Sequence, residues 1–533
     1  MFHEYGAAEN WNRQRLAPLL VRNGLVVAGH PLAAAAGAGV LMQGGNAVDA
    51  AIALSAVLGV VRPQMCGLGG DLLMQVYWAA DRQVHALNAN GPAPRAANLA
   101  RFSGGLPRKG PLAPTVPGQV GGWAAAHERF GSRPWSSLLQ PAIDYAEQGF
   151  PVYTRFAFWS RSAQDVYRDY PRSVETLLPN GSPPQVGEIF RQPRLTRTLR
   201  TLADEGAESF YRGGLARRLV GGIREAGGLI DEQDLADLTL RWESPVRGSY
   251  RGYTVTQQPP SSQGYVIPQM LNMLEPEDAR RLGWGTVELV DLLVRAKIAA
   301  FAERDRTLGD PTRVSVPLDR LLDKRHARRL LAESAVGVPS SSDAGETTAF
   351  SVVDRDGNAV TAIQSLYFDS GVVAGDTGIL LNGRMNAFSL DPVSPNVLAP
   401  GKRPLYTMNT WMVLSGGRLR FMGGTPGGHG QVQTNLQVLL NLIDFEMSPQ
   451  EAVEAPRWVH GDVVHGGSGS RLSLEGRYDP QLAEGLRARG YDVDVVDDWS
   501  EMTHGSAKII EVTPVGILSA GCDPRRDAQA VGF

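Results

Sequence analysis

The strongest constraint on the fold is the run 47–61, which is apolar on nearly every face of a helix. Asn46 stands directly before this run and fits the N-cap position of a helix. A helix that is apolar all round is covered on all sides in a large protein. The run therefore predicts a helix at the centre of a sizeable core.

Strand and turn signals flank this buried helix. Residues 25–28 predict a strand, which a turn at His30-Pro31 joins to an alanine-rich helix ending near residue 42. A glycine-rich loop at 66–71 then leads into a strand at 72–78. Polar residues and a proline interrupt the apolar stretch 24–61, so it is not expected to span a bilayer.

The character of the chain changes near residue 347. Residues 120–345 are helical in pattern, whereas 347–353 and 359–368 predict two strands joined by an Asp-Gly hairpin turn at 356–357. Further strands are expected at 378–381, 410–414, 419–422, 507–512 and 516–518, with a helix at 431–444. Two sheets with helices outside them are the simplest arrangement that buries these elements.

Charge and cysteine content exclude several classes of function. The net charge of −3 supplies no field that favours nucleic acid or an anionic membrane. Cys66 and Cys522 allow at most one disulfide. The first thirty residues carry scattered charges and no uninterrupted apolar core, so no secretory signal peptide is expected. These features predict a soluble cytoplasmic protein without membrane or nucleic-acid partners.

The segment 338–346 is small and polar, and it leads directly into the strand that begins at Thr347. A threonine hydroxyl needs a base to act as a nucleophile. Cleavage of the bond between Glu346 and Thr347 would supply one, because the new α-amino group has a pKa of about 7.7–8.0. By itself a threonine at a strand start is weak evidence, since threonine is a common strand residue.

The sequence around Thr347 resembles the gamma-glutamyltransferase family of N-terminal-nucleophile hydrolases. The matching stretches include GETTAFSVVD (345–354), GDTGILLN (375–382) and GTPGG (424–428). Others follow the family's order over almost the whole chain, at 44–51, 67–71, 115–118, 356–360, 402–405, 455–457 and 522–525.

The resemblance implies an α+β fold, a four-layer αββα sandwich, built from two associated fragments, 1–346 and 347–533. It implies that Thr347 is the nucleophile, first on the carbonyl of Glu346 and later on a substrate amide. Ser365 is implied as a hydrogen-bond partner of the nucleophile, and Gly427 and Gly428 as the oxyanion-hole loop. No cofactor and no metal are expected, and a homodimer is the candidate assembly.

Five positions depart from the family's acyl pocket. Asn90 stands where an arginine usually holds the substrate carboxylate, and Ala387 where an aspartate takes the ammonium. Tyr367 replaces an asparagine, and Tyr406 and Thr407 replace paired serines. The nucleophile and the oxyanion loop are kept, so amide cleavage is a firmer prediction than a γ-glutamyl substrate.

Several hypotheses remain open at this stage. The acyl donor is γ-glutamyl, as in glutathione, or the chain is instead an oxamate-type amidohydrolase or an acylase. Arg384 either replaces the lost carboxylate anchor or is an ordinary surface arginine. A third hypothesis, of another class, is an uncleaved relative that binds without catalysis. His460, Asp462 and His465 lack the spacing of a usual zinc site.

Overall fold

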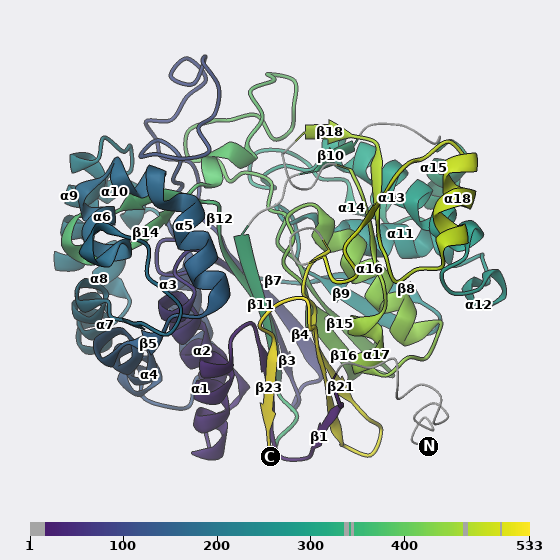
Figure 1. Cartoon of the computed structure of the whole chain (residues 1–533), viewed down its shortest axis with the longest axis horizontal. Coiled ribbons are helices and arrows are strands. Elements are labelled where there is room, and N and C mark those ends of the chain that lie inside the picture. Colours follow the sequence, from purple (N-terminus) through teal and green to yellow (C-terminus); the bar gives the residue numbers. More distant parts are fainter. Residues whose placement is uncertain (1–15, 335–339, 343–345, 462–466, 501–503) are drawn as a thin grey trace.

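The computed structural model describes residues 16–334, 340–342, 346–461, 467–500 and 504–533. Two seven-stranded antiparallel sheets lie face to face, and helices cover the outer face of each sheet (Figure 1). The predicted four-layer αββα sandwich is therefore confirmed.

The first sheet interleaves strands from the two ends and the middle of the chain. Its strands run, in spatial order, β23 (Gln529–Gly532), β2 (Leu25–Ala28), β11 (Glu346–Val353), β12 (Ala359–Tyr367), β3 (Asp71–Trp78), β4 (Gln83–Ala89) and β7 (Trp242–Glu243). The predicted hairpin is β11 and β12, with Gly357 in the left-handed region at φ 82° in the turn.

The second sheet is built from the middle and the C-terminal third of the chain, with one strand from the N-terminal end. Its order is β1 (Leu19–Val21), β22 (Leu518–Cys522), β21 (Lys508–Val512), β16 (Arg418–Gly424), β15 (Thr410–Ser415), β9 (Tyr253–Gln257) and β8 (Val246–Tyr250).

Alternation along the strands separates the cores. Leu25 and Val27 of β2 pack between the two sheets, with Met412 and Met422 of the second sheet. Val26 points the other way, into the core under the helices. Because successive side chains of a strand face opposite sides, one strand serves both cores.

The helix layer over the first sheet surrounds α2 (Ala47–Val61), in which every residue is buried. Asn46 caps α2, as predicted, and Asp49 completes a capping box with it. The other helices on this side are α1 (Pro31–Met42), α3 (Gln119–Phe130), α4 (Trp135–Gln148), α5 (Thr154–Arg168), α6 (Pro171–Leu177), α7 (Pro193–Glu205), α8 (Glu208–Tyr211), α9 (Gly214–Glu225) and α10 (Glu232–Ala236).

The helix layer over the second sheet is centred on α11 (Val266–Leu274), α13 (Val287–Thr307) and α16 (Gly430–Ile443), which share one apolar core. It also contains α12 (Ala279–Leu282), α14 (Leu318–Leu321), α15 (Lys324–Ala332), α17 (Pro449–Glu454) and α18 (Pro480–Ala488). Shorter strands lie outside the two large sheets: β5 (Phe150–Pro151), β6 (Ile189–Phe190), β10 (Ser340–Ser342), β13 (Asp369–Val373), β14 (Leu380–Asn382), β17 (Trp458–His460), β18 (Gly467–Gly469), β19 (Arg471–Glu475) and β20 (Asp492–Val496).

Two expectations from the sequence are wrong. The supposedly helical middle contributes β8 and β9, which pair around a tight turn at Arg251-Gly252. The last hairpin strand begins at Leu518 instead of residue 516, because Gly516 lies in the turn at φ 82°. Of the predicted flexible segment 338–346, residues 338, 339 and 343–345 fall outside the described part. No described helix is long and apolar enough to cross a membrane.

Candidate active site

Thr347 lies at the head of β11, where the pairing with β12 is irregular. Glu346 pairs with Tyr367 and Thr348 with Gln364, so two residues of β12 face the single residue Thr347. One of these two is Ser365, whose Oγ lies 3.0 Å from Thr347 Oγ1. A bulge of this kind re-aims a side chain. Here it accompanies direct contact between the two hydroxyls.

The backbone of β12 orients the Ser365 hydroxyl. The Tyr367 N–H donates to Ser365 Oγ at 2.6 Å. Tyr367 holds φ +66°, a left-handed conformation that costs a residue with a side chain on the order of 1–3 kcal/mol. The Ser365 hydroxyl, which accepts from the Tyr367 N–H, is thereby held against Thr347 Oγ1, and either of the two hydroxyls can donate in that contact.

The predicted oxyanion loop connects β16 to α16. Gly424, the last residue of β16, packs against Ala349 of β11, two residues beyond Thr347. Gly427 and Gly428 follow with φ of 129° and 54°, values that disfavour any side chain. Helix α16 then begins at Gly430, so its positive dipole end lies beside this loop.

A second cluster surrounds Arg384, in the 3₁₀ turn Arg384–Ala387 that follows β14. The guanidinium of Arg384 lies 4.5 Å from the ring centre of Tyr367 and 4.4 Å from that of Tyr406. Its Nε donates to Asp71 Oδ2 at 3.3 Å, and the other oxygen of Asp71 accepts the Gly91 N–H at 3.1 Å. Both charged side chains are fully buried. The surface-arginine hypothesis for Arg384 is therefore wrong.

The Arg384 guanidinium is only partly satisfied. Neither Nη1 nor Nη2 has a hydrogen-bond partner within the described part of the chain. Burial raises the pKa of the Asp71 carboxyl to about 6, although the neighbouring Arg384 charge pulls it down. Buried polar groups are nearly always hydrogen-bonded, so two unused donors on one buried cation point to a missing acceptor.

Comparison with known proteins fits this geometry. The gamma-glutamyltranspeptidase family model matches residues 33–533. The glutathione hydrolase-like YwrD proenzyme of Bacillus subtilis (strain 168) is 39% identical over 96% of this chain and 98% of its own length. The oxamate amidohydrolase proenzyme of Klebsiella pneumoniae is 37% identical over 96% of this chain and 98% of its own. The crystal structure of the cephalosporin acylase from Bacillus halodurans superimposes with a TM-score of 0.91 at 33% identity, covering 100% of this chain and 99% of the other.

The chain belongs to the gamma-glutamyltranspeptidase family. It is therefore an N-terminal-nucleophile enzyme made as a proenzyme.

Within this gamma-glutamyltranspeptidase-family site, the predicted substrate residues divide into two groups. Tyr367, Arg384 and Tyr406 form one cluster. Asn90 lies next to this cluster, because Tyr406 Oη donates to the backbone oxygen of the following residue, Gly91, at 3.3 Å. The side-chain amide of Asn90 donates instead to Ser261 Oγ at 3.1 Å.

Thr407 is the predicted substrate residue that the structure does not bring into this cluster. It is buried, and the contacts described for it are those of its backbone oxygen, which accepts from the Gln263 and Asn409 amides at 2.9 and 3.0 Å. These contacts hold the backbone at Thr407 and do not involve its side chain.

Sequence reasoning missed two residues near the Thr347 site of this gamma-glutamyltranspeptidase-family chain. Along the sequence, Asp71 is only the end of a glycine-rich loop. His429 directly follows Gly428, and its Nδ1 accepts from Arg304 Nη1 at 2.8 Å, since an arginine can only donate. Burial, with the charges of Arg304 and Lys297, lowers the pKa of His429 well below its usual value. Asp71 and Arg384 are 313 residues apart in the sequence, and His429 and Arg304 are 125 apart. No local sequence pattern predicts contacts at such separations.

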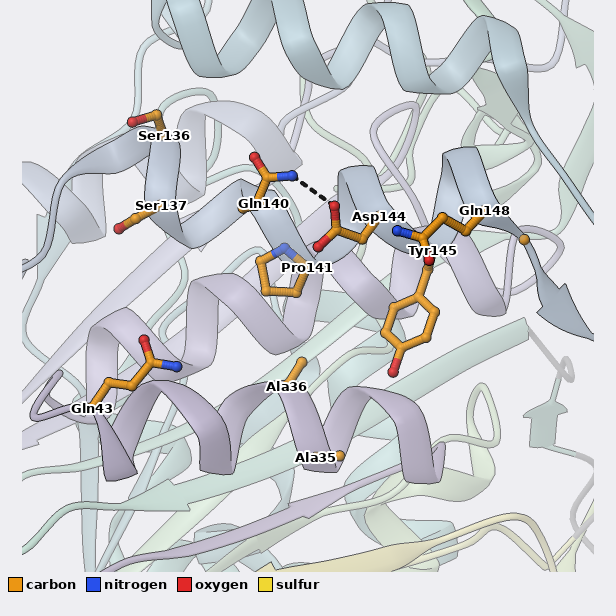
Figure 2. Close-up of a pocket in the computed structure, with 11 residues that line it drawn as sticks. Ala35, Ala36, Gln43, Ser136, Ser137, Gln140, Pro141, Asp144, Tyr145 and Gln148 are labelled. Carbon is orange, nitrogen blue, oxygen red and sulfur yellow. Dashed lines mark hydrogen bonds between the residues drawn. The ribbon is translucent and has the colours of Figure 1, made fainter.

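Two other features lie apart from this site. His460 Nδ1 contacts Lys297 Nζ at 3.2 Å, while Asp462 and His465 fall outside the described residues. No cluster of metal-binding side chains occurs in the described part. Figure 2 shows a groove between α1 and α4, where Gln140 donates to Asp144 at 2.7 Å. None of the predicted site residues lines this groove.

Proposed function

We propose that the chain cleaves itself between Glu346 and Thr347 and that the exposed Thr347 then cleaves an amide substrate. The observation that carries the proposal is the 3.0 Å contact between Thr347 Oγ1 and Ser365 Oγ at the head of β11. In self-cleavage, Thr347 Oγ1 attacks the carbonyl carbon of Glu346. The C–N bond breaks, the nitrogen takes a proton, and water hydrolyses the resulting ester.

The same hydroxyl then serves substrate cleavage. The free α-amino group of Thr347, with a pKa of about 7.7–8.0, takes the hydroxyl proton as the oxygen attacks the amide carbonyl. The N–H groups at Gly427 and Gly428 bind the developing oxyanion, where each such donor is worth about 2.7–4 kcal/mol. The proton passes to the leaving amine, and water or a second amine releases the acyl group from Thr347.

The two fragments remain one folded unit in this proposal. Strands β11 and β12 of 347–533 lie between β2 and β3 of 1–346 in the same sheet. Cutting the chain before Thr347 therefore breaks no pairing beyond the head of β11. Residues 1–346 and 347–533 are the proposed large and small subunits.

Intact mass spectrometry of the purified protein tests self-cleavage. The 57.4 kDa chain is expected to give fragments of about 37 kDa (346 of 533 residues) and about 20 kDa (the other 187). Thr347→Ala should stay whole. The matched control is Thr348→Val, because Thr348 Oγ1 is buried without a hydrogen-bond partner in the described part, and this variant should still cleave.

The alternative of another class, an uncleaved binding protein, makes the opposite prediction. Wild type would then stay whole while its circular dichroism shows it folded. That result would refute the proposed self-cleavage.

A further inference from the structure

The proposed oxyanion loop is fastened to the rest of the fold at both of its ends. On the β16 side, Thr425 Oγ1 accepts the Ser506 N–H at 2.9 Å. On the α16 side, His429 Nδ1 accepts from Arg304 Nη1 at 2.8 Å. Between these two points lie the two glycines 427–428, which carry the proposed donors. His429 is therefore the first side chain beyond the donors that can hold them in place.

The two glycines need such support because of their conformation. Their φ values, 129° and 54°, lie in the region that favours glycine, which is also the residue with the most conformational freedom to lose. Backbone donors stabilise an oxyanion strongly only when they are already aimed at its position before the reaction. Since the glycines have no side chains, neighbouring residues must hold their N–H groups in that position.

Arg304, on α13, is a fixed anchor for the ring of His429. Its side chain is fully buried. The guanidinium lies 4.0 Å from the ring centre of Phe301, and its Nε and Nη2 donate to Asp305 Oδ1 at 2.8 and 2.7 Å. One face and the Nε edge of the guanidinium are thus both held, so the direction of Nη1 is set independently of His429.

The same nitrogen connects the oxyanion loop to the segment that carries Tyr406. Nη1 of Arg304 has two N–H groups, and it donates to Gln263 Oε1 at 2.7 Å as well as to His429. Gln263 in turn donates its side-chain amide to Thr407 O and its backbone N–H to Tyr406 O, both at 2.9 Å. One guanidinium nitrogen therefore fixes the spacing between two segments of the candidate site.

The contact also fixes the protonation state of the His429 ring. An arginine can only donate, so Nδ1 is the unprotonated nitrogen and the ring is neutral, with its proton on Nε2. A second proton on Nδ1 would set two donors and two positive charges against each other. Burial, with the charges of Arg304 and Lys297, accordingly lowers the pKa of His429. The contact therefore persists at neutral pH.

We propose that Arg304 is a positioning residue, which through His429 Nδ1 holds the N–H groups of the oxyanion loop in the geometry that binds the developing negative charge. The inference rests on the proposed function, because it takes this loop as the oxyanion site. In this role Arg304 acts through His429 and makes no contact with the substrate. Loss of the contact should slow the chemical step and leave substrate binding nearly unchanged.

Steady-state kinetics of two His429 variants test the contact. The donors are γ-glutamyl-p-nitroanilide and butyryl-p-nitroanilide, of which the faster in wild type is used, and kcat is referred to the cleaved fraction. We expect His429→Leu to lower kcat on the order of 10-fold, less than the roughly 100- to 1000-fold that removal of a donor costs. KM should stay within about twofold of wild type.

His429→Asn separates the contact from the other end of the ring. Its Oδ1 takes the place of Nδ1 as an acceptor for Arg304, but it has no counterpart of the Nε2–H. We expect its kcat within about threefold of wild type. A folded His429→Leu chain that stays whole while His429→Asn cleaves also supports the proposal. A kcat of His429→Asn as low as that of His429→Leu contradicts it, because the Nε2–H would then be the group that matters.

A boronic acid measures the oxyanion geometry without an acyl donor. In n-butylboronic acid, boron bonds to Thr347 Oγ1, the hydroxyl proton passes to the α-amino group, and the tetrahedral boronate carries the negative charge. Its dissociation constant, measured by isothermal titration calorimetry, should rise in His429→Leu by about the factor by which kcat falls. A wild type that cleaves itself and binds no boronate overturns the proposal.

A double-mutant cycle tests whether Arg304 acts through His429. In the Arg304→Met background, His429→Leu should lower kcat no further, because the contact is already lost. Losses that multiply refute the proposal. The matched control is His85→Leu, which breaks a contact of the same kind, between His85 Nδ1 and Arg129 Nη2 at 3.0 Å, and should leave kcat unchanged. If Arg304→Met does not fold, the two His429 variants still decide.

Intact mass separates the failure of this inference from the failure of the proposed function. If wild type cleaves itself and hydrolyses a donor, and His429→Leu keeps the wild-type kcat, the positioning role is wrong and the proposed function stands. If wild type neither cleaves itself nor binds the boronate, the proposed function is wrong, and the positioning role is wrong with it.

Discussion

Two buried arginines in this molecule have opposite surroundings. Arg525, in the loop between β22 and β23, donates Nε and Nη2 to the two oxygens of Glu475, both at 2.6 Å. Its Nη1 donates to Val453 O at 2.8 Å and contacts Asp523 at 3.2 Å. The guanidinium of Arg384 makes one hydrogen bond among the described residues, to Asp71, and its Nη1 and Nη2 have no partner there.

The difference separates a charge that the protein satisfies from one that it leaves partly unsatisfied. Both guanidiniums are fully buried, so both have lost their hydration. Protein acceptors replace the lost water at Arg525, whereas Nη1 and Nη2 of Arg384 have no acceptor in the described part. A buried donor left unsatisfied costs about 1–3 kcal/mol, and a substrate that satisfies it recovers that free energy on binding. The two arginines therefore differ in hydrogen bonding and not in burial.

The largest expected effect on stability is at Arg525. Arg525→Met leaves the buried Glu475 carboxylate without its bidentate partner, and such a break costs about 3–5 kcal/mol. Urea unfolding followed by circular dichroism measures the loss. A change below about 1 kcal/mol would remove the distinction between the two arginines, because Arg525 would then contribute no more than an exposed pair.

A fall in pH should change the free energy of unfolding in opposite directions through the Asp523 carboxyl beside Arg525 and the Asp71 carboxyl beside Arg384. Although burial alone would raise it, the charges of Arg457 and Arg525 lower the pKa of Asp523 to about 2. The stability from Asp523 is therefore present above about pH 3.8, its unfolded value, and is lost as the pH falls toward 2. Asp71, whose pKa burial raises to about 6, loses stability as the pH rises from about 3.8 to 6.

The free energy of unfolding measured from pH 2 to 7 tests these signs. In Asp71→Asn the free energy of unfolding should no longer decline as the pH rises from about 3.8 to 6. Its increase as the pH rises from 2 toward about 3.8, which comes from Asp523, should remain. If the decline persists in the variant, another group causes it and the charge of Asp71 is compensated better than its contacts indicate.

The smallest expected effect is the stability change in Arg384→Met. Replacing a poorly satisfied buried ion by an apolar side chain is often neutral or stabilising. We expect the free energy of unfolding to stay within about 1 kcal/mol of wild type at pH 5, where Asp71 can take up a proton. A loss as large as that of Arg525→Met would make Arg384 a structural residue.

Local patterns predicted much of the fold. The all-apolar run 47–61 is the fully buried α2, and Asn46 caps it. The Asp-Gly turn joins β11 to β12. Strands β8 and β9 were missed because their short segments lie in a chain region dominated by helical patterns. Strand β9 holds its place by pairing with β15, which lies far away in the sequence, and β8 pairs with β9 at the edge of the sheet.

The candidate site shows the same division. The order of motifs along the chain is enough to indicate Thr347, Ser365, Gly427 and Gly428, and it leads to the family. It does not decide whether Arg384 is an anchor or a surface residue, and it does not reveal Asp71 or His429. Residue type and spacing are local properties that the sequence records directly. Burial and hydrogen-bond partners depend on which distant segments meet, and for Arg384 and Asp71, 313 residues apart, only the folded layers decide that.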